Sequence, residues 1–578
     1  MDDGYRAWLD DERVDPELRE ELRTLERMGQ TEELADRFAA HLAFGTGGLR
    51  AKLGAGTNRM NVHTVRKASA GVVRWLCAQP PSVPRRIVIA YDGRHKSAQF
   101  AMDCARVAAA YNVEAFVFPE ARPTPLLSYA VRYLQCGAGV MVTASHNPAD
   151  YNGYKVYGAD GAQVLAKAAM AIVDEMERAG DLLDIPLQEE QEARAKGLLQ
   201  TVAPIVEASY MDELTVLHRA LHAGEKEALS IVYTPLHGTG GALVPQALKR
   251  AGFTHVHIVA EQATLDAEFT HVRSPNPEEK AAYDLALDTA RRLAEDPTVG
   301  APDILLATDP DADRVGVMAR RFDGTYMPLS GNEVGALVLA DYLADLKNRA
   351  LLPDNATVVT THVTSDFGEA VARSFGVDTE RTLTGFKFIG EKIAQYEASG
   401  KRAFVFGYEE SVGYLAKPFV RDKDSVQAVL LIAQMAAALK AQGSDLPTAL
   451  QRLFDQFGFY FDRQLSFTFE GQSGIEQMRA LMTDLRQQAL EVEHLSLMAV
   501  EDAWAGITRF ADGRETALTL PQSDVLKFLY TGGAWIAVRP SGTEPKLKAY
   551  LGVCEPSEQA AMQRLDQLQH AFKKRANL

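Results

Sequence analysis

Between about residue 87 and residue 406, short apolar segments alternate with longer stretches of helical periodicity. Each apolar segment has the length of one strand, and they lie at 87–91, 115–118, 139–143, 231–234, 255–259, 304–308, 358–361 and 403–406. Strands that alternate with helices are typical of α/β layers. Because a single hydrophobic core stops growing near about 250–300 residues, a chain of 578 residues is expected to form several such domains.

Both ends of the chain depart from this alternation. Residues 10–41 are charged and carry apolar residues such as Leu18, Leu22 and Leu25 at helical spacing, which indicates an N-terminal helical extension. Residues 465–469 alternate between apolar and polar, as a half-buried antiparallel strand does. We therefore expect a helical extension over 1–40, three consecutive α/β mixed-sheet domains over 41–205, 206–325 and 326–460, and a C-terminal α+β domain over 461–578.

The composition, with 47% hydrophobic and 24% charged residues, is that of an ordinary soluble globular protein. The formal charge of −16, from 61 basic and 77 acidic residues, argues against a nucleic-acid partner. Residues 1–5 lack the basic and apolar regions of a signal peptide, and the apolar tract near 429–439 is short and broken by Gln434. We therefore expect a cytoplasmic location and no membrane partner. The cysteines form no C-x-x-C pair, so neither zinc nor a disulfide framework is expected of Cys77, Cys104, Cys136 and Cys554.

A serine follows the apolar run 138–142, in the segment 143–148 with sequence Thr-Ala-Ser-His-Asn-Pro. Ser145 and His146 could be a hydrolase nucleophile and its base, but adjacent residues at a strand end point to opposite faces and no G-x-S-x-G elbow is present. Alternatively the segment forms only a turn, as Ser, Asn and Pro commonly do. The segment by itself is compatible with that second interpretation.

Three aspartates alternate in the segment 309–314, which follows another apolar run. Asp309, Asp311 and Asp313 can direct three carboxylates to one ion, and such hard oxygen ligands favour Mg²⁺, Mn²⁺ or Ca²⁺. An EF-hand is excluded because Arg314 and Arg320 occupy the places that need Gly and Glu. The alternative is an Asx-rich turn. Three protein ligands leave coordination positions open, which a phosphate oxygen could fill.

Near the C-terminus the segment 539–543, Arg-Pro-Ser-Gly-Thr, has the composition of a phosphate-binding loop. Arg539 offers a guanidinium fork, and the glycine allows backbone N–H groups to approach an anion. Lys546 and Lys548 add positive charge or form the solvent face of a strand. The Gly-rich segments 45–50 and 237–241 do not match a P-loop, and each is a weak signal alone. His255 and His257 share one strand face, where packing is the expected role.

These motifs together resemble the α-D-phosphohexomutase superfamily, specifically its phosphoglucomutase and phosphopentomutase branch. The resemblance covers about residues 40–555 and rests on six segments in the family's order: 45–50, 143–148, 309–314, 384–387, 407–414 and 539–546. Gly48 and Ala51 stand where relatives more often carry Ala and Gly. The resemblance implies four domains with one loop of each lining a central cleft.

The resemblance also implies roles for individual residues. Ser145 would carry a covalent phosphate, and Mg²⁺ would be bound by Ser145, Asp309, Asp311 and Asp313. Catalysis would involve Arg50 and Lys155 beside the reacting phosphate, with His146 in support. The substrate would be bound by Arg314, Lys387, Glu409 and Ser411 around the sugar and by Arg539, Ser541, Gly542 and Thr543 at the distal phosphate.

The predicted reaction interconverts α-D-glucose 1-phosphate and glucose 6-phosphate, with glucose 1,6-bisphosphate as intermediate and activator. Lys155 is predicted to be the general base, because Arg50 and Mg²⁺ could lower its pKa; alternatively it only neutralises charge. Phosphopentomutase and phosphomannomutase activities would use the same serine and metal. A metal-dependent sugar phosphatase, which transfers the phosphoryl group to water, is a more distant alternative, as is a non-catalytic phosphosugar-binding protein.

Overall fold

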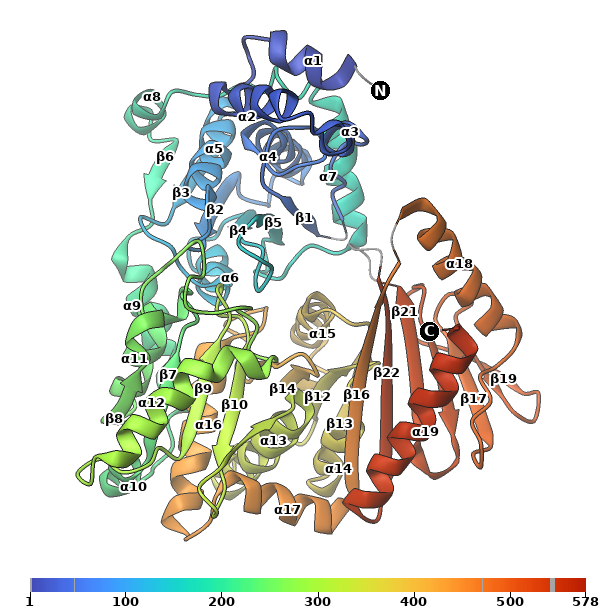
Figure 1. Cartoon of the computed structure of the whole chain (residues 1–578). Coiled ribbons are helices and arrows are strands. Elements are labelled where there is room, and N and C mark those ends of the chain that lie inside the picture. The colour runs from blue at the N-terminus through green and yellow to red at the C-terminus, as the bar shows by residue number, and fades with distance from the viewer. Residues whose placement is uncertain (1–2, 46, 470, 541–545, 578) are drawn as a thin grey trace. The chain divides into compact units, whose positions relative to one another are not determined.

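The computed structural model of the chain describes residues 3–45, 47–469, 471–540 and 546–577 (Figure 1). The chain forms two compact units. The first comprises Met1–Leu329, Ile389–Gly400 and Ser411–Asp445, and the second comprises Ser330–Phe388, Lys401–Glu410 and Leu446–Leu578. Helices and sheets occur in both, and the predicted α/β class with a separate antiparallel C-terminal part is confirmed.

The N-terminal extension consists of α1 (Asp3–Asp10), α2 (Pro16–Arg27) and α3 (Thr31–Phe38). Helix α2 begins at Pro16, whose missing N–H costs nothing in the first turn, and the Asp15 carboxylate accepts the Glu17 N–H at 2.9 Å. Trp8, Leu22 and Leu34 bury their side chains in one small core. The predicted helical extension is therefore confirmed as three short helices.

The first sheet has the strand order β1-β5-β4-β2-β3-β6. The strands β2, β3, β4 and β6 run parallel, whereas β5 is antiparallel to both β4 and β1. Its elements are β1 (Gly48–Lys52), α4 (Val62–Ala78), β2 (Arg86–Tyr91), α5 (Ser97–Ala110), β3 (Glu114–Val117), α6 (Thr124–Tyr133), β4 (Ala138–Val142), β5 (Tyr151–Gly158), α7 (Ala166–Arg178), α8 (Glu190–Ala195) and β6 (Leu199–Thr201).

The second sheet has the order β11-β10-β9-β7-β8, with β7 parallel to β8 and β9 and the remaining pairs antiparallel. The tight connection between β9 and β10 carries the three aspartates. Its elements are α9 (Pro204–Glu213), α10 (Ala223–Ala228), β7 (Ser230–Thr234), α11 (Gly240–Arg250), β8 (His255–Ile258), α12 (Asp284–Glu295), β9 (Ile304–Thr308), β10 (Val315–Arg320) and β11 (Tyr326–Leu329), with 3₁₀ turns at Leu214–Leu217, Ala260–Gln262 and Lys280–Tyr283.

The first unit also contains β15 (Gly413–Leu415) and α16 (Ser425–Ala441). The Asp424 side chain caps α16 by accepting the N–H groups of Val426 and Gln427. Among the described residues no single helix has the length and hydropathy of a membrane span. The next helix, α17 (Leu446–Phe457), belongs to the second unit.

In the second unit the parallel strands β13, β12 and β14 are hydrogen-bonded in that order. The elements here are α13 (Gly331–Asn348), β12 (Ala356–Thr361), α14 (Phe367–Ser374), β13 (Asp378–Thr382) and β14 (Ala403–Glu409). Helix α15 (Phe386–Ser399) begins in this unit.

The C-terminal sheet is antiparallel throughout, in the order β16-β22-β21-β20-β17-β18-β19. The predicted alternation at 465–469 is confirmed, because β16 alternates between half-buried and exposed side chains along its second half. The elements are β16 (Phe459–Thr468), α18 (Gly471–Gln487), β17 (Leu497–Asp502), β18 (Ile507–Phe510), β19 (Glu515–Ala517), β20 (Leu526–Tyr530), a 3₁₀ turn (Thr531–Gly533), β21 (Trp535–Pro540), β22 (Lys546–Glu555) and α19 (Glu558–Ala576).

All eight strands expected from the apolar segments are present as β2, β3, β4, β7, β8, β9, β12 and β14. The largest difference is at β14, which continues three residues beyond the expected end to Glu409. The boundaries at 41–205, 206–325, 326–460 and 461–578 stay a prediction.

Close packing in the second unit predicts the effect of one added methyl group. Gly335 lies in α13, where a Cβ atom would stand 2.5 Å from Cδ2 of the buried Tyr408 ring. Gly335→Ala should therefore destabilise the protein by about 1–3 kcal/mol through overpacking. Gly224→Ala in α10 is the matched control, because a Cβ there meets no atom within 4 Å and the helix should gain about 0.5–1 kcal/mol. Thermal denaturation followed by circular dichroism should give a lower Tm for Gly335→Ala only; an unchanged Tm would contradict this packing.

Candidate active site

Ser145 lies just after β4 in a strained backbone conformation. Its φ of 51° is in the left-handed region, which is rare for residues other than glycine and is often found at functional sites. The Ser145 hydroxyl donates to Asp309 Oδ2 at 2.7 Å and lies 3.3 Å from His146 Nδ1. The Ser145 N–H donates to Thr143 Oγ1 at 2.8 Å. The serine is thus held with its hydroxyl directed at the aspartate loop.

Arg94 holds the serine loop in this conformation. The residue follows β2, and its side chain forms an ion pair with Asp92 in which both side chains are fully buried. The guanidinium also donates to the backbone oxygens of the serine and of three residues after it. The acceptors are the carbonyl oxygens of Ser145 at 2.6 Å, Pro148 at 2.7 Å, Tyr151 at 3.1 Å, and Asn147. One planar guanidinium therefore binds four carbonyl oxygens of the serine loop.

The carboxylates of Asp309, Asp311 and Asp313 converge in the β9–β10 connection. All three side chains are buried, and each offers an oxygen that lies within 4.8 Å of the others. Between them Ala312 has a φ of 49°, which turns the chain so that alternate side chains point the same way. Asp311 Oδ1 and Asp313 Oδ1 are buried without a hydrogen-bond partner among the described residues. The sequence-based prediction of a convergent cluster agrees with this geometry.

Basic side chains partly neutralise this cluster. Lys155 Nζ lies 2.7 Å from Asp311 Oδ2 and 3.4 Å from Asp313 Oδ2. Lys423 Nζ lies 3.1 Å from Asp313 Oδ2.

The antiparallel register of β1 and β5, which sets Gly48 opposite Lys155, leaves no room for a side chain at residue 48, because a Cβ would be 1.9 Å from the Tyr154 oxygen. The glycine that departs from the family pattern thus fits this register.

The arrangement of charges fits a divalent cation. Burial raises the pKa of Asp309 well above its ordinary value, and the neighbouring carboxylates of Asp311 and Asp313 raise it further. Burial acts in the same direction on Asp311, but the charge and hydrogen bond of Lys155 lower the pKa of Asp311 below its ordinary value. A hard divalent ion would relieve the repulsion and use the two unpartnered oxygens. Mg²⁺ fits this oxygen-only donor set.

The prediction of a lowered Lys155 pKa assumed Arg50 and Mg²⁺ as its neighbours, and the protein side chains around Lys155 act in the opposite direction. Burial does oppose the charged form, but Asp311 and Asp313 outweigh it and raise the pKa of Lys155 above its ordinary value. The sequence argument placed Arg50 beside this lysine and did not foresee that carboxylates would be its hydrogen-bonding partners. Arg50 instead donates to Asn147 Oδ1 at 3.2 Å. The alternative interpretation of Lys155, as a neutraliser of charge, agrees better with these contacts.

His146 is held in its neutral form. Burial lowers its pKa well below the ordinary value, and the charges of Arg314 and Arg50 act in the same direction. Arg314 itself is anchored by the ion pair between its Nη1 and Glu278 Oε1 at 2.8 Å. A neutral imidazole beside the serine hydroxyl can accept a proton or a hydrogen bond.

The loops that carry these residues are connected by further contacts. Thr124 at the start of α6 donates its hydroxyl to Asp311 Oδ2 at 2.7 Å, and its N–H donates to the Asp311 carbonyl at 2.9 Å. Gly238 permits a close backbone approach, because a Cβ there would lie 2.5 Å from Pro310 Cα. The Thr239 N–H donates to the Pro310 carbonyl at 2.8 Å. The aspartate loop is thus fixed from two sides.

The second unit holds another group of the predicted residues. Glu409 ends β14 and accepts the Gly385 N–H at 2.7 Å, two residues before Lys387. Arg539 in β21 donates to Tyr550 Oη at 3.2 Å and interacts with the charge of Glu409. Burial opposes the charge of Arg539, but Tyr550 and the nearby carboxylates raise its pKa above the ordinary value. Ser411 belongs to the first unit. Ser541, Gly542 and Thr543 lie outside the described residues.

Sequence reasoning missed Arg94, Thr124 and Lys423. Arg94 carried a usable signal, because Asp92-Gly93-Arg94 is a polar loop at the carboxyl end of a predicted strand, where ligands collect in open α/β sheets. Thr124 and Lys423 carried none that one sequence can show. They approach the aspartates only through tertiary packing, from positions more than 100 residues away along the chain.

Comparisons with known proteins agree with these observations. Family models match four consecutive parts of the chain, described as "Phosphoglucomutase/phosphomannomutase, alpha/beta/alpha" domain I over residues 41–182, domain II over 208–324, domain III over 330–457, and the C-terminal domain over 478–569. The chain is 37% identical over 555 residues to a phosphoglucomutase of Staphylococcus haemolyticus, covering 96% of both chains. It is 36% identical to a phosphoglucomutase of Staphylococcus aureus, covering 92% of this chain and 93% of that one.

Solved structures show the same fold. A putative phosphomannomutase from Thermus thermophilus is similar with a TM-score of 0.67 at 21% identity, over 92% of this chain and 99% of that one. Parafusin from Paramecium, described as a phosphoglucomutase in its open form, has a TM-score of 0.66 at 18% identity, over 93% of this chain and 95% of that one. At these identities the similarity supports the fold alone.

The role of Arg94 can be tested by a substitution that keeps its charge. Arg94→Lys cannot donate to several carbonyl oxygens in fixed directions, so the Ser145 loop should lose its conformation. We expect kcat of the activity proposed below to fall by about 100-fold, as misplacement of reacting groups by about 1 Å can cause. The matched control is Arg66→Lys, which alters another partly buried ion pair, that with Asp103. Steady-state kinetics should separate the two variants; equal activity would mean that Arg94 does not position the serine.

Proposed function

This chain belongs to the phosphoglucomutase/phosphomannomutase family, and we propose that it interconverts α-D-glucose 1-phosphate and glucose 6-phosphate. The membership agrees with the superfamily resemblance of its sequence motifs. It makes the chain an enzyme of the isomerase class that moves a phosphoryl group within a sugar. One observation supports the proposal most: the Ser145 hydroxyl lies 2.7 Å from the first of three converging carboxylates.

The proposed reaction transfers a phosphoryl group from Ser145 and later returns one. In the first step the bond between phosphorus and Ser145 Oγ breaks while a bond to the free hydroxyl oxygen of the substrate forms. That hydroxyl loses its proton to neutral His146, which we assign as the acceptor. The protonated imidazole then gives a proton to the departing Ser145 Oγ, which lies 3.3 Å from its Nδ1. The product of the step is glucose 1,6-bisphosphate. After the bisphosphate turns around, its other phosphate returns to Ser145 and the mutase product leaves.

Charge compensation is the main contribution of the surrounding residues. Asp309, Asp311 and Asp313 would hold Mg²⁺ together with Ser145, and the ion would neutralise charge on the transferring group. Lys155 Nζ lies 2.7 Å from Asp311 Oδ2, and we assign its ammonium group electrostatic stabilisation of the same oxygens. Arg50 would act similarly.

Substrate recognition is proposed for residues on different segments. Glu409 and Ser411 would form hydrogen bonds with sugar hydroxyls. Lys387 and Arg314 would also bind the substrate. The distal phosphate would be held by Arg539, Ser541, Gly542 and Thr543, since a guanidinium fork and backbone N–H groups suit a phosphate. We propose a cytoplasmic location for this activity.

The sugar specificity requires an experiment that compares substrates. Purified protein with Mg²⁺ and catalytic glucose 1,6-bisphosphate is given the α-1-phosphates of glucose, mannose and ribose, and kcat/KM is measured for each. We expect the value for glucose 1-phosphate to be the largest. A preference for ribose 1-phosphate or mannose 1-phosphate would change the substrate and keep the mechanism. Release of inorganic phosphate without isomerisation would instead indicate a sugar phosphatase.

Removal of the Ser145 hydroxyl tests its role as phosphate carrier. Ser145→Ala should lose nearly all mutase turnover, a decrease of about 10⁴-fold or more, because no covalent intermediate can form. Its thermal stability should stay near the wild-type value. The matched control is Ser230→Ala, which removes a buried serine hydroxyl that has no hydrogen-bond partner among the described residues. If Ser145→Ala turned over like Ser230→Ala, the covalent route would be wrong.

The charge of Lys387 predicts a pH dependence of substrate binding. Burial lowers the pKa of Lys387 from 10.5 to about 8. The ammonium group is therefore present below that pH and is lost as the pH rises through it. If Lys387 binds the anionic substrate, KM should rise several-fold between about pH 7 and pH 9, by loss of a charge-assisted contact. Lys387→Arg stays protonated throughout this range and should remove the rise. Identical pH profiles for the two proteins would contradict the assignment.

A further inference from the structure

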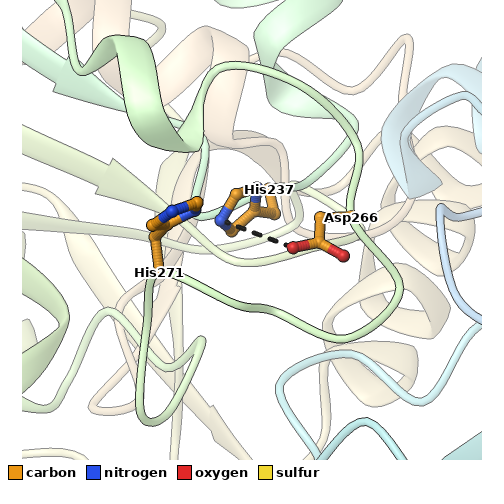
Figure 2. A group of neighbouring side chains, drawn as sticks. All are labelled: His237, Asp266 and His271. Atoms are coloured by element: carbon orange, nitrogen blue, oxygen red, sulfur yellow. Dashed lines mark ion pairs between the residues drawn. The ribbon is translucent and has the colours of Figure 1, made fainter.

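Two histidines and an aspartate lie together beside the second sheet, separate from the Asp309 cluster (Figure 2). His237 follows β7, whereas Asp266 and His271 belong to the long connection after β8. Each of the three offers an atom that lies within 4.8 Å of the other two, and His237 Nε2 is 4.0 Å from Asp266 Oδ2. The imidazole rings of His237 and His271 have centroids 5.5 Å apart and are tilted by 30°.

His237 has the hydrogen bonding of a metal ligand. Its Nδ1 lies 2.9 Å from the carbonyl oxygen of Thr264, which can only accept, so Nδ1 carries the proton. In the neutral ring Nε2 then has a free lone pair. The side chain is 2% exposed, and Nε2 is buried with no hydrogen-bond partner in the part of the chain that the structure describes. Metal-binding histidines typically donate the other ring N–H to a backbone carbonyl in this way.

The other two side chains complete a nitrogen and oxygen donor set. Asp266 accepts the N–H groups of Glu268 at 3.0 Å and Thr270 at 2.9 Å, which orient its carboxylate. The Thr270 hydrogen bonds lower the pKa of Asp266 to about 2, so it is ionised at neutral pH. The side chain of His271 is exposed, while its carbonyl accepts from Gln262 Nε2 at 2.8 Å. The backbone carbonyl of Gln262 in turn accepts the His237 N–H at 3.1 Å. Gln262 therefore links the segment that carries His237 to the segment that carries His271.

We propose that His237, Asp266 and His271 form a second metal site, which binds a borderline divalent transition metal such as Zn²⁺. Imidazole with one carboxylate suits Zn²⁺, Co²⁺ or Cu²⁺, whereas the carboxylates at Asp309 suit Mg²⁺. Bonds of about 2.0–2.1 Å to tetrahedral Zn²⁺ bring neighbouring ligand atoms to about 3.3 Å. His237 Nε2 and Asp266 Oδ2 are 4.0 Å apart, so binding would draw the Asp266 carboxylate inward. A fourth position would remain for water.

The connection after β8, which supplies Asp266 and His271, also contacts Arg94, the residue that holds the serine loop. Phe269, with a φ of 50°, lies between Asp266 and His271, and its ring centroid is 4.9 Å from the guanidinium carbon of Arg94. Glu268 Oε1 is 2.7 Å from His95 Nε2. A metal that fixes Asp266 and His271 would therefore also fix the residues that contact Arg94 and His95. Binding should raise the thermal stability of the protein as well as take up metal.

The experiment measures zinc binding by protein whose Asp309 cluster has been weakened. Asp311→Asn protein is first stripped of metal with a chelator and then transferred to a buffer with excess Mg²⁺. It is titrated with Zn²⁺ by calorimetry, and Tm is measured with and without Zn²⁺. We expect one tight zinc site and a rise in Tm. Adding His271→Ala or Asp266→Asn to this background should weaken the zinc affinity by more than about tenfold, since loss of even an outer-shell partner costs about 10–100-fold. His271 is exposed, so its substitution leaves the core intact.

The matched control adds His494→Ala to the Asp311→Asn background. It removes a histidine whose side chain is 74% exposed and which is distant in sequence from the proposed zinc site. This variant should keep the zinc affinity of its parent. Co²⁺ provides a spectroscopic check, because four-coordinate Co²⁺ bound by histidine absorbs visible light strongly and His271→Ala should abolish the band. The proposal is overturned if Asp311→Asn protein binds no Zn²⁺, as expected if His237 and Asp266 form only an ion pair. Equal zinc affinity in the His271→Ala and His494→Ala variants would also overturn it.

Discussion

The repulsion among three buried carboxylates is the constraint on which the site depends. Two like charges about 4 Å apart repel by about 4 kcal/mol at an effective dielectric of 20, so Asp309, Asp311 and Asp313 require compensation. Lys155 and Lys423 supply part of it at distances of 2.7–3.4 Å. Two carboxylate oxygens still lack hydrogen-bond partners among the described residues. The folded chain is thus prepared for a dication and for a substrate whose phosphate shares that ion.

Backbone strain accompanies this concentration of charge. Ser145 and Ala312 both adopt left-handed conformations, each of which costs about 1–3 kcal/mol and persists only because the surroundings enforce it. The enforcement comes from tertiary contacts: Arg94 donates to the serine loop, and Gly238 lets one backbone approach the aspartate loop at Pro310. Catalytic geometry here rests on residues that do not themselves react.

Much of this could be predicted from sequence, because it depends on local patterns. Apolar runs located the strands, and the residues just after them, Ser145 and Asp309, were recognised as candidates because strand ends present ligands. The carboxylate partners of Lys155 were not predicted, since they depend on the pairing of β5 with its neighbours and on the approach of the β9–β10 connection. Lys423 and Thr124 were missed for the same reason. The charges and pKa values of the site residues depend on contacts between segments far apart in the chain. The pattern of a single sequence does not show which segments make these contacts.

The most direct test of the account follows the phosphoryl group itself. Wild-type protein is incubated with glucose 1,6-bisphosphate carrying isotopically labelled phosphates, and the labelled peptide is identified by mass spectrometry. The protein is then chased with unlabelled glucose 1-phosphate. The account predicts label on Ser145 that moves into the sugar phosphates during one turnover. Continued turnover with no label on Ser145, or with label there that does not leave during the chase, would contradict a phosphoserine route.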